Sequence, residues 1–228
     1  MSGFWDALPT QRLMVDGSLW SARLHSLKDD MARVESYVDL YHVDVTDAHF
    51  APGLLFFPDL VAALRPFTQK PIHVHLMVES PLALINDFAA AGANLITIHA
   101  ENGDQIAPSF ERMRALNVHA GLAIQLETPL DTVLHWLDQI VLVTLMGTKL
   151  GIKGIDLDPS QYERISTMRA MLTERGLNAS IKIANDGGNR THTIPSMRAA
   201  GVDAVVPGSL IFGSTNLDET FAWLHGLS

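Results

Sequence analysis

Apolar residues along the chain follow two spacings that alternate. Short runs rich in Val, Ile, Leu and Met, typical of buried strands, precede longer segments in which apolar residues recur every three or four positions, as on one face of a helix. The strand-like runs lie at residues 12–20, 38–46, 71–78, 94–99, 118–125, 140–146, 180–185 and 203–207. The helical segments lie at residues 27–37, 58–67, 81–92, 106–117, 129–139, 160–176, 193–201 and 217–226. The pattern predicts eight strands that alternate with eight helices.

The regular alternation indicates the fold class. Several helical segments end in a glycine before the next strand, at Gly92, Gly176 and Gly201, as a left-handed C-terminal residue requires. Eight strand–helix units in 228 residues indicate an α/β fold of the (β/α)8 TIM-barrel type. An open doubly wound sheet is the alternative, but the first strand–helix turn lacks a glycine-rich dinucleotide-binding sequence. We therefore expect one (β/α)8 barrel domain over residues 1–228, with residues 1–10 as a short N-terminal extension.

The composition narrows the classes of function. No apolar run approaches the roughly 20 residues of a membrane helix, and the start, MSGFWDALPTQRL, lacks the basic and apolar regions of a secretory signal. The chain has no cysteine, which fits a reducing cytosol, and its formal net charge of −9 argues against a nucleic-acid-binding surface. We expect a cytoplasmic protein without membrane or nucleic-acid partners. A small anionic ligand remains compatible with this charge, because backbone amides can bind phosphate.

The stretch YHVDVTDAHFAPG, residues 41–53, places polar residues on an otherwise apolar strand. His42 and Asp44 are two positions apart, so both side chains point to the same side of the strand, toward the barrel axis. Two histidines on the third strand, the second of which is His75, have the same spacing of two positions. The seventh strand runs into Asp186. Active sites of such barrels lie at the carboxyl ends of the strands, so these side chains are predicted to converge there.

Two imidazoles and two carboxylates are suited to a divalent transition metal such as zinc, iron, manganese or cobalt. The candidate ligands are His42, Asp44, His75 and Asp186. An all-oxygen magnesium or calcium site is less well suited to two histidines. Taken singly, His73, His99 and His119 are explained at least as well as hydrogen-bonded core residues. That explanation fails for the four candidates together, because buried carboxylates without partners cost several kcal/mol.

Glycine-containing turns follow the seventh and eighth strands. Gly187 and Gly188 come directly after Asp186, and Gly208 and Ser209 follow the last strand. Either pair alone is an ordinary turn. Barrels of this kind commonly bind phosphate at these two places through backbone amides, so their position predicts a phosphate site.

These segments resemble the ribulose-phosphate 3-epimerase family along nearly the whole chain. HVDVTDAHFAPG is similar to the family's HVDVMDGHFVPN, and PIHVHLMVESP is similar to its DVHLMVxxP strand. The segment NDGGNRTHTIPSMRAAGVDAVVPGSLIFGS is similar to its VDGG…AGA…V.GSAIF ending, and SLWSA to its SILSA. The matches are long and specific.

The resemblance implies an isomerase of carbohydrate metabolism that epimerises C3 of a ketose phosphate. The substrate pair would be D-ribulose 5-phosphate and D-xylulose 5-phosphate, or a related pentulose or hexulose phosphate. The four candidate ligands would bind one divalent metal that stabilises an enediolate, while Asp44 removes the C3 proton from one face and Asp186 returns a proton to the other. The implied substrate-binding residues are Ser18, His75, Met77, Gly151, Gly187, Gly188, Gly208 and Ser209. We also expect a homo-oligomer.

The chain departs from the family at two kinds of position. Thr46 and Thr144 stand where the resemblance implies methionines near the reacting carbons, and Gly53 replaces an asparagine. The loop after the sixth strand, normally a PGFGG segment, is TKLGIKG at residues 148–154 and keeps one glycine of that set. It brings in Lys149 and Lys153 as candidate phosphate contacts. The native substrate is therefore left open, with another ketose phosphate such as allulose 6-phosphate as an alternative.

Two other functions remain as alternatives. A decarboxylase or aldolase of the orotidine-monophosphate or hexulose-phosphate type would need a strand lysine flanked by aspartates, and the third strand, HVHLMVES, has no lysine. A non-catalytic sugar-phosphate-binding barrel is suggested by the altered loop. It is disfavoured because all four metal and acid positions are retained.

Overall fold

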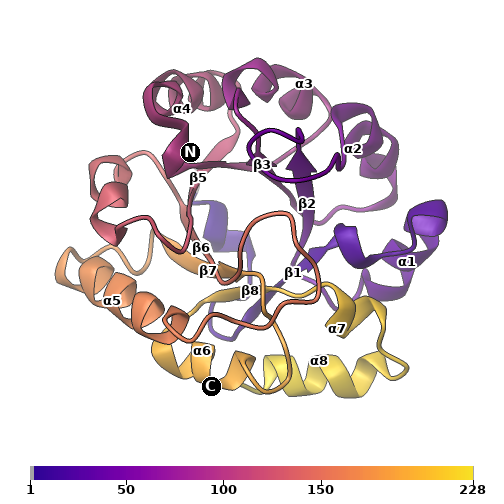
Figure 1. Ribbon diagram of the computed structural model, residues 1–228. Coiled ribbons are helices and arrows are strands. Elements are labelled where there is room, and N and C mark those ends of the chain that lie inside the picture. The colour runs from indigo at the N-terminus through magenta and orange to yellow at the C-terminus, as the bar shows by residue number, and fades with distance from the viewer. Residues whose placement is uncertain (1–2, 228) are drawn as a thin grey trace.

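Eight parallel strands close into a barrel in the computed structural model, which describes residues 3–227 (Figure 1). The strands are β1 (Met14–Ser18), β2 (Leu40–Thr46), β3 (Ile72–Met77), β4 (Leu95–His99), β5 (His119–Ile124), β6 (Leu142–Met146), β7 (Lys182–Asp186) and β8 (Ala204–Val206). Each strand pairs with its neighbour in sequence, and β8 pairs with β1. The predicted (β/α)8 barrel is confirmed.

Helices surround the barrel (Figure 1). They are α1 (Leu27–Val34), α2 (Pro58–Leu64), α3 (Ile85–Ala90), α4 (Ile106–Ala115), α5 (Gln161–Glu174), α6 (Ile194–Ala200), α7 (Ser209–Phe212) and α8 (Leu217–His225). Within residues 3–227, no helix is both long enough and apolar enough to cross a membrane. Gly92, Gly176 and Gly201 adopt the left-handed conformation that the sequence predicted for them.

Two helical elements differ from the prediction. The segment 129–139 was expected to form a helix like the others, but it forms the 3₁₀ helix η7 (Leu130–Trp136). Val133 is the only buried residue of η7. The tighter 3₁₀ form commonly serves as a connector between longer elements. The four-residue helix α7 was not predicted, because a single turn carries no periodic pattern.

The amino-terminal end of the barrel is closed by an apolar cluster. Trp5, in the 3₁₀ helix η1 (Phe4–Ala7), packs against the layer formed by Met14, Leu95, Leu142, Ala184 and Ala204. Its indole N–H donates to the carbonyl oxygens of Val141 at 2.9 Å and Ser180 at 3.2 Å. Val141 directly precedes β6, and Ser180 lies just before β7. These hydrogen bonds therefore fix the start of the chain to the amino-terminal end of the barrel.

The interior of the barrel above that layer is polar. TIM-barrel interiors are usually filled by branched apolar residues. Here the central positions are occupied by Asp16, His42, His73, His75, Thr97, His99 and Thr144, each no more than 2% exposed. The main apolar core instead lies between the outer faces of the strands and the surrounding helices. Because buried polar groups are costly unless paired, this column of residues requires an organised hydrogen-bond network.

Candidate active site

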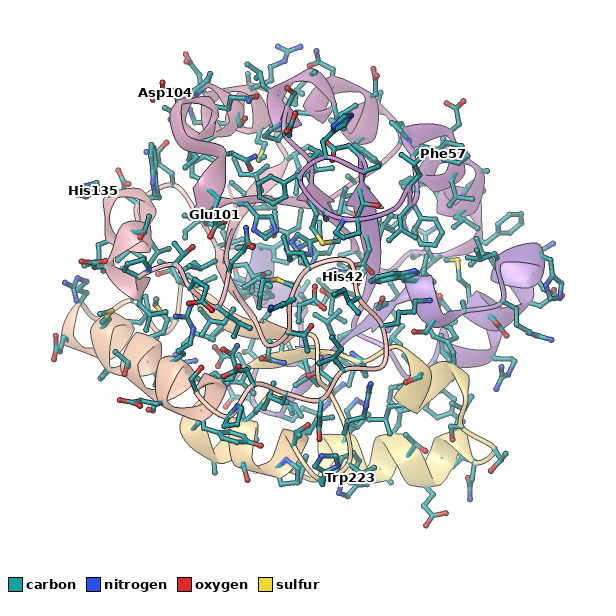
Figure 2. The ribbon with its side chains drawn as sticks, viewed as in Figure 1. His42, Phe57, Glu101, Asp104, His135 and Trp223 are labelled. Atoms are coloured by element: carbon teal, nitrogen blue, oxygen red, sulfur yellow. The ribbon has the colours of Figure 1, made fainter. Side chains whose placement is uncertain are left out.

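Strand register brings the four candidate ligands together at the carboxyl end of the barrel. Asp44 on β2 is the Cα partner of His75 on β3, and Asp186 is the last residue of β7. One nitrogen or oxygen atom from each of these residues and from His42 lies within 4.8 Å of the others. We call His42, Asp44, His75 and Asp186 the four-residue cluster. In Figure 2, His42 lies close to the barrel axis.

The atoms of the cluster face one another at short distances. His42 Nε2 lies 3.3 Å from Asp44 Oδ1 and 3.6 Å from Asp186 Oδ2. His75 Nδ1 lies 3.1 Å from Asp186 Oδ2 and 3.9 Å from Asp44 Oδ1. The Ser18 hydroxyl donates to Asp44 Oδ2 at 2.7 Å, so one oxygen of that carboxylate is fixed and the other faces the cluster.

Asp16 lies directly beneath the cluster and was missed by the sequence analysis. Its Oδ2 is 3.0 Å from His42 Nδ1 and 2.5 Å from His73 Nδ1. Because a carboxylate accepts hydrogen bonds, His42 donates from Nδ1, and Nε2 is the ring nitrogen that faces the cluster. Asp16 precedes Ser18 by two positions on β1, so the alternation of strand side chains was a signal that it points inward.

The donor set fits a bound divalent metal. His42 Nε2 is buried and has no hydrogen-bond partner within residues 3–227. An imidazole whose other nitrogen donates to a carboxylate is the usual arrangement of a metal-binding histidine. Two imidazole nitrogens and two carboxylate oxygens match the ligands that transition metals prefer.

The electrostatics of the cluster favour a positive charge at its centre. Burial alone would lower the pKa of His42, but the carboxylates of Asp44 and Asp16 outweigh this and raise the pKa well above its ordinary value. Burial would raise the pKa of Asp44, yet the neighbouring His42, His75 and Ser18 lower it. A proton on His42 and a bound metal would therefore compete for the same place.

The remaining buried histidines have different surroundings. His73 Nε2 lies 2.7 Å from Thr97 Oγ1, and its other nitrogen contacts Asp16, so it is a hydrogen-bonded core residue. His119 is half-buried near the amino end of the barrel, with its ring 4.9 Å from that of Phe4. His99 is also hydrogen-bonded, but one of its partners is His75 of the cluster.

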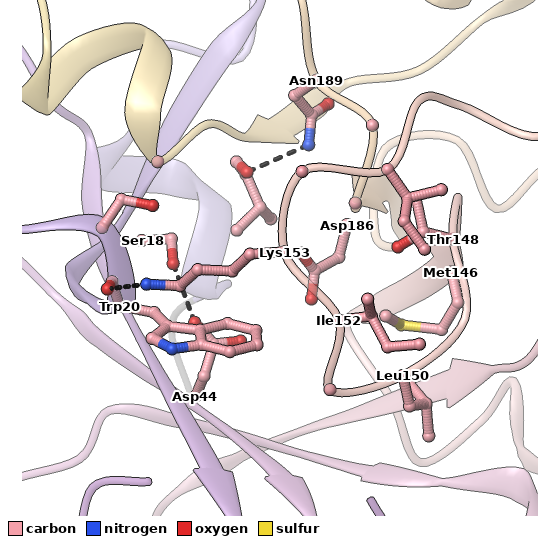
Figure 3. Close-up of a pocket in the computed structure, with 18 of the residues that line it drawn as sticks. Ser18, Trp20, Asp44, Met146, Thr148, Leu150, Ile152, Lys153, Asp186 and Asn189 are labelled. Atoms are coloured by element: carbon pink, nitrogen blue, oxygen red, sulfur yellow. Dashed lines mark hydrogen bonds between the residues drawn. The ribbon is translucent and has the colours of Figure 1, made fainter. Parts of the chain in front are cut away.

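A cavity of about 320 Å³ opens above the cluster (Figure 3). Seven of the predicted substrate-binding residues line it, namely Ser18, Met77, Gly151, Gly187, Gly188, Gly208 and Ser209. The eighth, His75, is fully buried within the cluster. Asp44 and Asp186 reach the same cavity. The structure thus brings together the residues that the sequence analysis selected.

The roof of the cavity is the segment 147–160 between β6 and α5, which we call the roof loop. It crosses the barrel mouth in Figure 1. Leu150 packs with Met77, Met146 and Ala51. Gly151 has φ +69°, and a Cβ there would lie 2.6 Å from Pro52 Cδ, so a larger residue would clash. The roof loop therefore rests on the segment that follows β2.

Lys153 joins the roof loop to Trp20, in the segment that follows β1. Its ammonium group donates to the carbonyl oxygen of Trp20 at 2.5 Å and lies 4.7 Å from the centre of the Trp20 ring (Figure 3). Burial lowers the pKa of Lys153, and the nearby Asp44 acts in the opposite direction. Lys149 also lines the cavity, but its side chain is exposed and makes no hydrogen bond within the described chain.

Arg190 is a third cation at the cavity and was not selected from the sequence. It follows Gly188 by two positions and lines the cavity. Its Nη1 donates to the carbonyl oxygen of Asn189 at 3.3 Å. An arginine just after a predicted phosphate-binding turn was a readable signal, because guanidinium groups bind phosphate well.

Neither Thr46 nor Thr144 lines the cavity. The resemblance implied that both stand at methionine positions near the reacting carbons. Thr144 is fully buried in the barrel, whereas Met146, two residues further along β6, lines the cavity beside Met77. The hydroxyl of Thr46 donates to the carbonyl oxygen of Gly53 at 3.0 Å and does not line the cavity. Two methionines therefore flank the cavity despite these threonines.

A buried amide network supports the turn that carries Asp186. Gln161 Nε2 donates to Asn185 Oδ1 at 2.8 Å, and Asn185 Nδ2 donates to the carbonyl oxygen of Gly187 at 2.8 Å. Asn189 Nδ2 donates to the carbonyl oxygen of Val206 at 2.9 Å, as Figure 3 shows. The network links β7, β8 and α5, and so fixes where the turn begins and ends.

Comparison with known proteins identifies relatives along most of the chain. A sequence model of the Ribulose-phosphate 3 epimerase family matches residues 14–212. Ribulose-phosphate 3-epimerase of Synechocystis sp. is 34% identical over 218 residues, which cover 93% of each chain. The enzyme of Bacillus subtilis is 32% identical, covering 94% of this chain and 99% of its own. The chloroplastic ribulose-5-phosphate-3-epimerase of Arabidopsis thaliana is 33% identical, covering 94% of this chain and 76% of its own.

Solved structures with the same fold are more distant in sequence. KGPDC of Streptococcus mutans superposes with a TM-score of 0.70 at 14% identity, covering 95% of this chain and 100% of its own. Orotidine 5'-phosphate decarboxylase of Pyrococcus horikoshii superposes with a TM-score of 0.65 at 16% identity, covering 93% and 97%. At these identities the likeness concerns the barrel fold alone.

Proposed function

The chain belongs to the ribulose-phosphate 3-epimerase family, whose members are isomerases that act on carbohydrates, and from this we propose that it epimerises C3 of a ketose phosphate. D-ribulose 5-phosphate and D-xylulose 5-phosphate are the first candidate pair, and a related pentulose or hexulose phosphate is the second. The observation that carries the proposal is the pair of carboxylates at the cavity floor. Asp44 comes from β2 and Asp186 from β7, and these strands are not neighbours in the barrel.

Inversion of a carbon requires proton removal on one face and proton delivery on the other. Asp44 would accept the C3 proton, because its lowered pKa keeps it ionised at neutral pH and Ser18 holds its second oxygen away from the substrate. Asp186 would return a proton from the opposite face. A single acid would return the proton to the face it left.

The proposed metal would be held by His42 Nε2, His75 Nδ1 and the carboxylates of Asp44 and Asp186. When bound, a zinc, iron, manganese or cobalt ion would supply Lewis-acid stabilisation of negative charge on the substrate oxygens. The chain's own contribution is to keep these groups dry and oriented. His42 and His75 are fully buried, and Asp16 fixes the ring of His42.

The other end of the cavity suits a phosphate group. The main-chain N–H groups of Gly187, Gly188 and Gly208 donate to no protein group within residues 3–227. All three glycines line the cavity together with Lys153 and Arg190. Free amides and nearby cations are what a phosphate dianion needs, so we place the phosphate between the β7 and β8 turns and the roof loop.

The two alternative functions find less support. A decarboxylase-type lysine on the strands would have to reach the cluster, but β3 carries histidines at the inward positions. Lys182, at the start of β7, donates instead to the carbonyl oxygen of Asn178 at 2.7 Å. A purely binding protein would not require two opposed carboxylates beneath the cavity, since isolated buried carboxylates destabilise a fold.

We further propose that the protein is a cytoplasmic homo-oligomer. The absence of cysteine fits a reducing compartment. Leu54 and Phe57, in the segment between β2 and α2, are 79% and 58% exposed. Large exposed apolar residues close together are typical of contact surfaces, and light scattering of the purified protein would measure the assembly.

A panel of ketose phosphates tests the proposed function. Each compound is incubated with the purified protein in D₂O, with the metal content measured in parallel. The expected result is exchange of the C3 hydrogen together with formation of the C3 epimer, in a preparation that holds about one transition-metal ion per chain. Metal-replete protein that exchanges C3 of no ketose phosphate in the panel would contradict the proposal.

A further inference from the structure

The two histidines of the four-residue cluster present different ring nitrogens to its centre. His42 presents Nε2, and its Nδ1 is fixed by the carboxylate of Asp16. His75 presents Nδ1, at 3.1 Å from Asp186 Oδ2. The Nε2 of His75 therefore needs a partner of its own, and that partner is not a carboxylate.

The partner is a second imidazole, that of His99 at the end of β4. The two Nε2 atoms are 2.9 Å apart, the ring centres are 5.0 Å apart and the ring planes differ by 20°. Because the nitrogens are much closer than the ring centres while the planes are nearly parallel, the rings meet edge to edge. One nitrogen must donate and the other accept, and the distance alone does not say which.

Glu101 decides the direction of this hydrogen bond. Its Oε1 accepts the main-chain N–H of Gln125 at 3.0 Å and the hydroxyl of Thr128, and its Oε2 lies 3.1 Å from His99 Nδ1. Burial would raise the pKa of Glu101, but the hydrogen bonds from His99 and Thr128 lower it to about 2. An ionised carboxylate only accepts, so His99 donates to it from Nδ1.

The state of His99 then follows from its burial. The ring is fully buried, and burial in a low-dielectric interior favours the neutral imidazole over the charged one. A neutral imidazole with its hydrogen on Nδ1 has a lone pair on Nε2. The hydrogen between the two rings therefore belongs to His75 Nε2, which leaves His75 Nδ1 as the atom available to a metal.

We propose that Glu101 is a positioning residue that acts through His99 to hold the hydrogen of His75 on Nε2, so that His75 binds metal through Nδ1. The inference rests on the proposed metal-dependent function and adds two residues to it. We call Glu101 and His99 the relay. Asn102 holds His99 in place, because its Oδ1 accepts the His99 main-chain N–H at 2.9 Å and its Nδ2 donates to the Val78 carbonyl oxygen at 2.9 Å. Glu101 lies toward the β5 side in Figure 2, away from the labelled His42.

The tautomers of the metal-free protein test the proposal directly. Protein with ¹⁵N-labelled histidine is studied by long-range ¹H–¹⁵N correlation at neutral pH, and the signals are assigned with His75→Ala and His99→Ala variants. The expected spectrum shows His99 protonated on Nδ1 and bare on Nε2, with a hydrogen on His75 Nε2. A hydrogen on His99 Nε2 would overturn the proposal. This measurement needs neither bound metal nor substrate.

Metal affinity supplies the second test, with competing chelators as the readout. Glu101→Ala is expected to weaken binding about 10–100-fold, the usual loss when the group that orients a metal-binding histidine is removed. The matched control is Glu111→Ala, the same change at an exposed glutamate of α4, for which wild-type affinity is expected. Unchanged affinity in Glu101→Ala would contradict the relay.

A double-mutant cycle separates the relay from a local structural role. His99→Phe keeps an aromatic ring but removes the acceptor for His75. If Glu101 acts only through His99, the double variant binds metal no more weakly than His99→Phe alone, whereas independent roles make the two losses add. Failure of the proposed function looks different. Wild-type protein would then show the expected tautomers and yet take up no transition metal.

Discussion

Four side chains on three strands form the floor of the cavity, whereas its roof is one loop that leaves the barrel after Met146 and rejoins a helix at Gln161. The floor is held by strand register and by buried partners such as Asp16 and Ser18. The roof loop is held by a few contacts, of which the Lys153–Trp20 hydrogen bond and the packing of Leu150 are the clearest.

This difference indicates that the floor determines the chemistry and that the roof loop determines which substrate is preferred. Floor residues are buried and mutually dependent, so a change in one leaves a charge or a lone pair unsatisfied. Roof residues such as Lys149 and Ile152 are exposed and can change without disturbing the barrel. We therefore expect floor variants to lose turnover or metal, and roof variants to change the substrate that is preferred.

The largest effect is expected from the acid pair of the floor. Asp44→Asn and Asp186→Asn should each lower kcat about 10²–10⁴-fold, because each removes a positioned acid or base. Metal content is measured in both variants, since both residues are proposed ligands. The matched control is Asp156→Asn, at an exposed roof aspartate paired with His192, which should keep wild-type turnover. Near-normal turnover of either floor variant would rule out the two-acid mechanism.

A smaller effect, on metal affinity, is expected from Asp16, which lies beneath the four-residue cluster. Asp16→Asn should weaken metal binding about 10–100-fold, because an uncharged amide oxygen holds the hydrogen of His42 Nδ1 less firmly than a carboxylate does. Thr97→Val is the control, since it removes a hydrogen bond to His73 in the same buried layer without touching His42. Titration with a chelator measures both. Equal losses in the two variants would mean that the layer acts only through general packing.

The roof should affect substrate binding more than turnover. Lys153→Ala should raise KM about tenfold for the phosphorylated substrate, since hydrogen bonds to charged groups contribute about 1.5–3 kcal/mol. Lys149→Ala is the control, with a smaller increase because that side chain is exposed. Initial rates on a ketose phosphate and on the unphosphorylated sugar give the comparison. A KM that Lys153→Ala leaves unchanged would remove this lysine from the phosphate site.

The smallest effect concerns alkaline pH. Burial lowers the pKa of Lys153, so the ammonium loses its proton, and with it its attraction to phosphate, at a lower pH than an ordinary lysine. KM should therefore be constant on the acid side of this pKa and rise above it. In Lys153→Arg the rise should disappear, because a guanidinium stays charged. A KM–pH profile of both proteins decides, and identical profiles would assign the rise to another group.

The floor was largely predictable from the sequence, and the reason is geometric. Side chains alternate along a strand, so two histidines and two aspartates at the carboxyl ends of barrel strands must converge. Asp16 followed the same rule on β1 and was overlooked among the apolar residues around it. Glu101 was beyond such reasoning, because it reaches the cluster only through His99 and from a 3₁₀ helix.

The roof resisted prediction because loop conformation depends on contacts that no periodicity encodes. Lys149 and Lys153 are equivalent in the sequence, yet only Lys153 reaches the carbonyl of Trp20. Met146 shows the same limit, since an offset of two residues on β6 moves a side chain from the buried layer at Thr144 up to the cavity. Contacts between segments far apart in the chain had to be seen in the structure.

The closure of the opposite barrel end by Trp5 has a consequence for how this protein can be adapted. Its hydrogen bonds to Val141 and Ser180, and the apolar layer beneath it, lie at the amino ends of the strands, where barrels carry stability and not catalysis. Substitutions that improve the packing of Trp5 against this layer can thus raise the melting temperature, while substitutions that change the preferred sugar fall in the roof loop. Thermal stability and substrate preference can therefore be engineered separately, because the residues that determine them lie at opposite ends of the barrel.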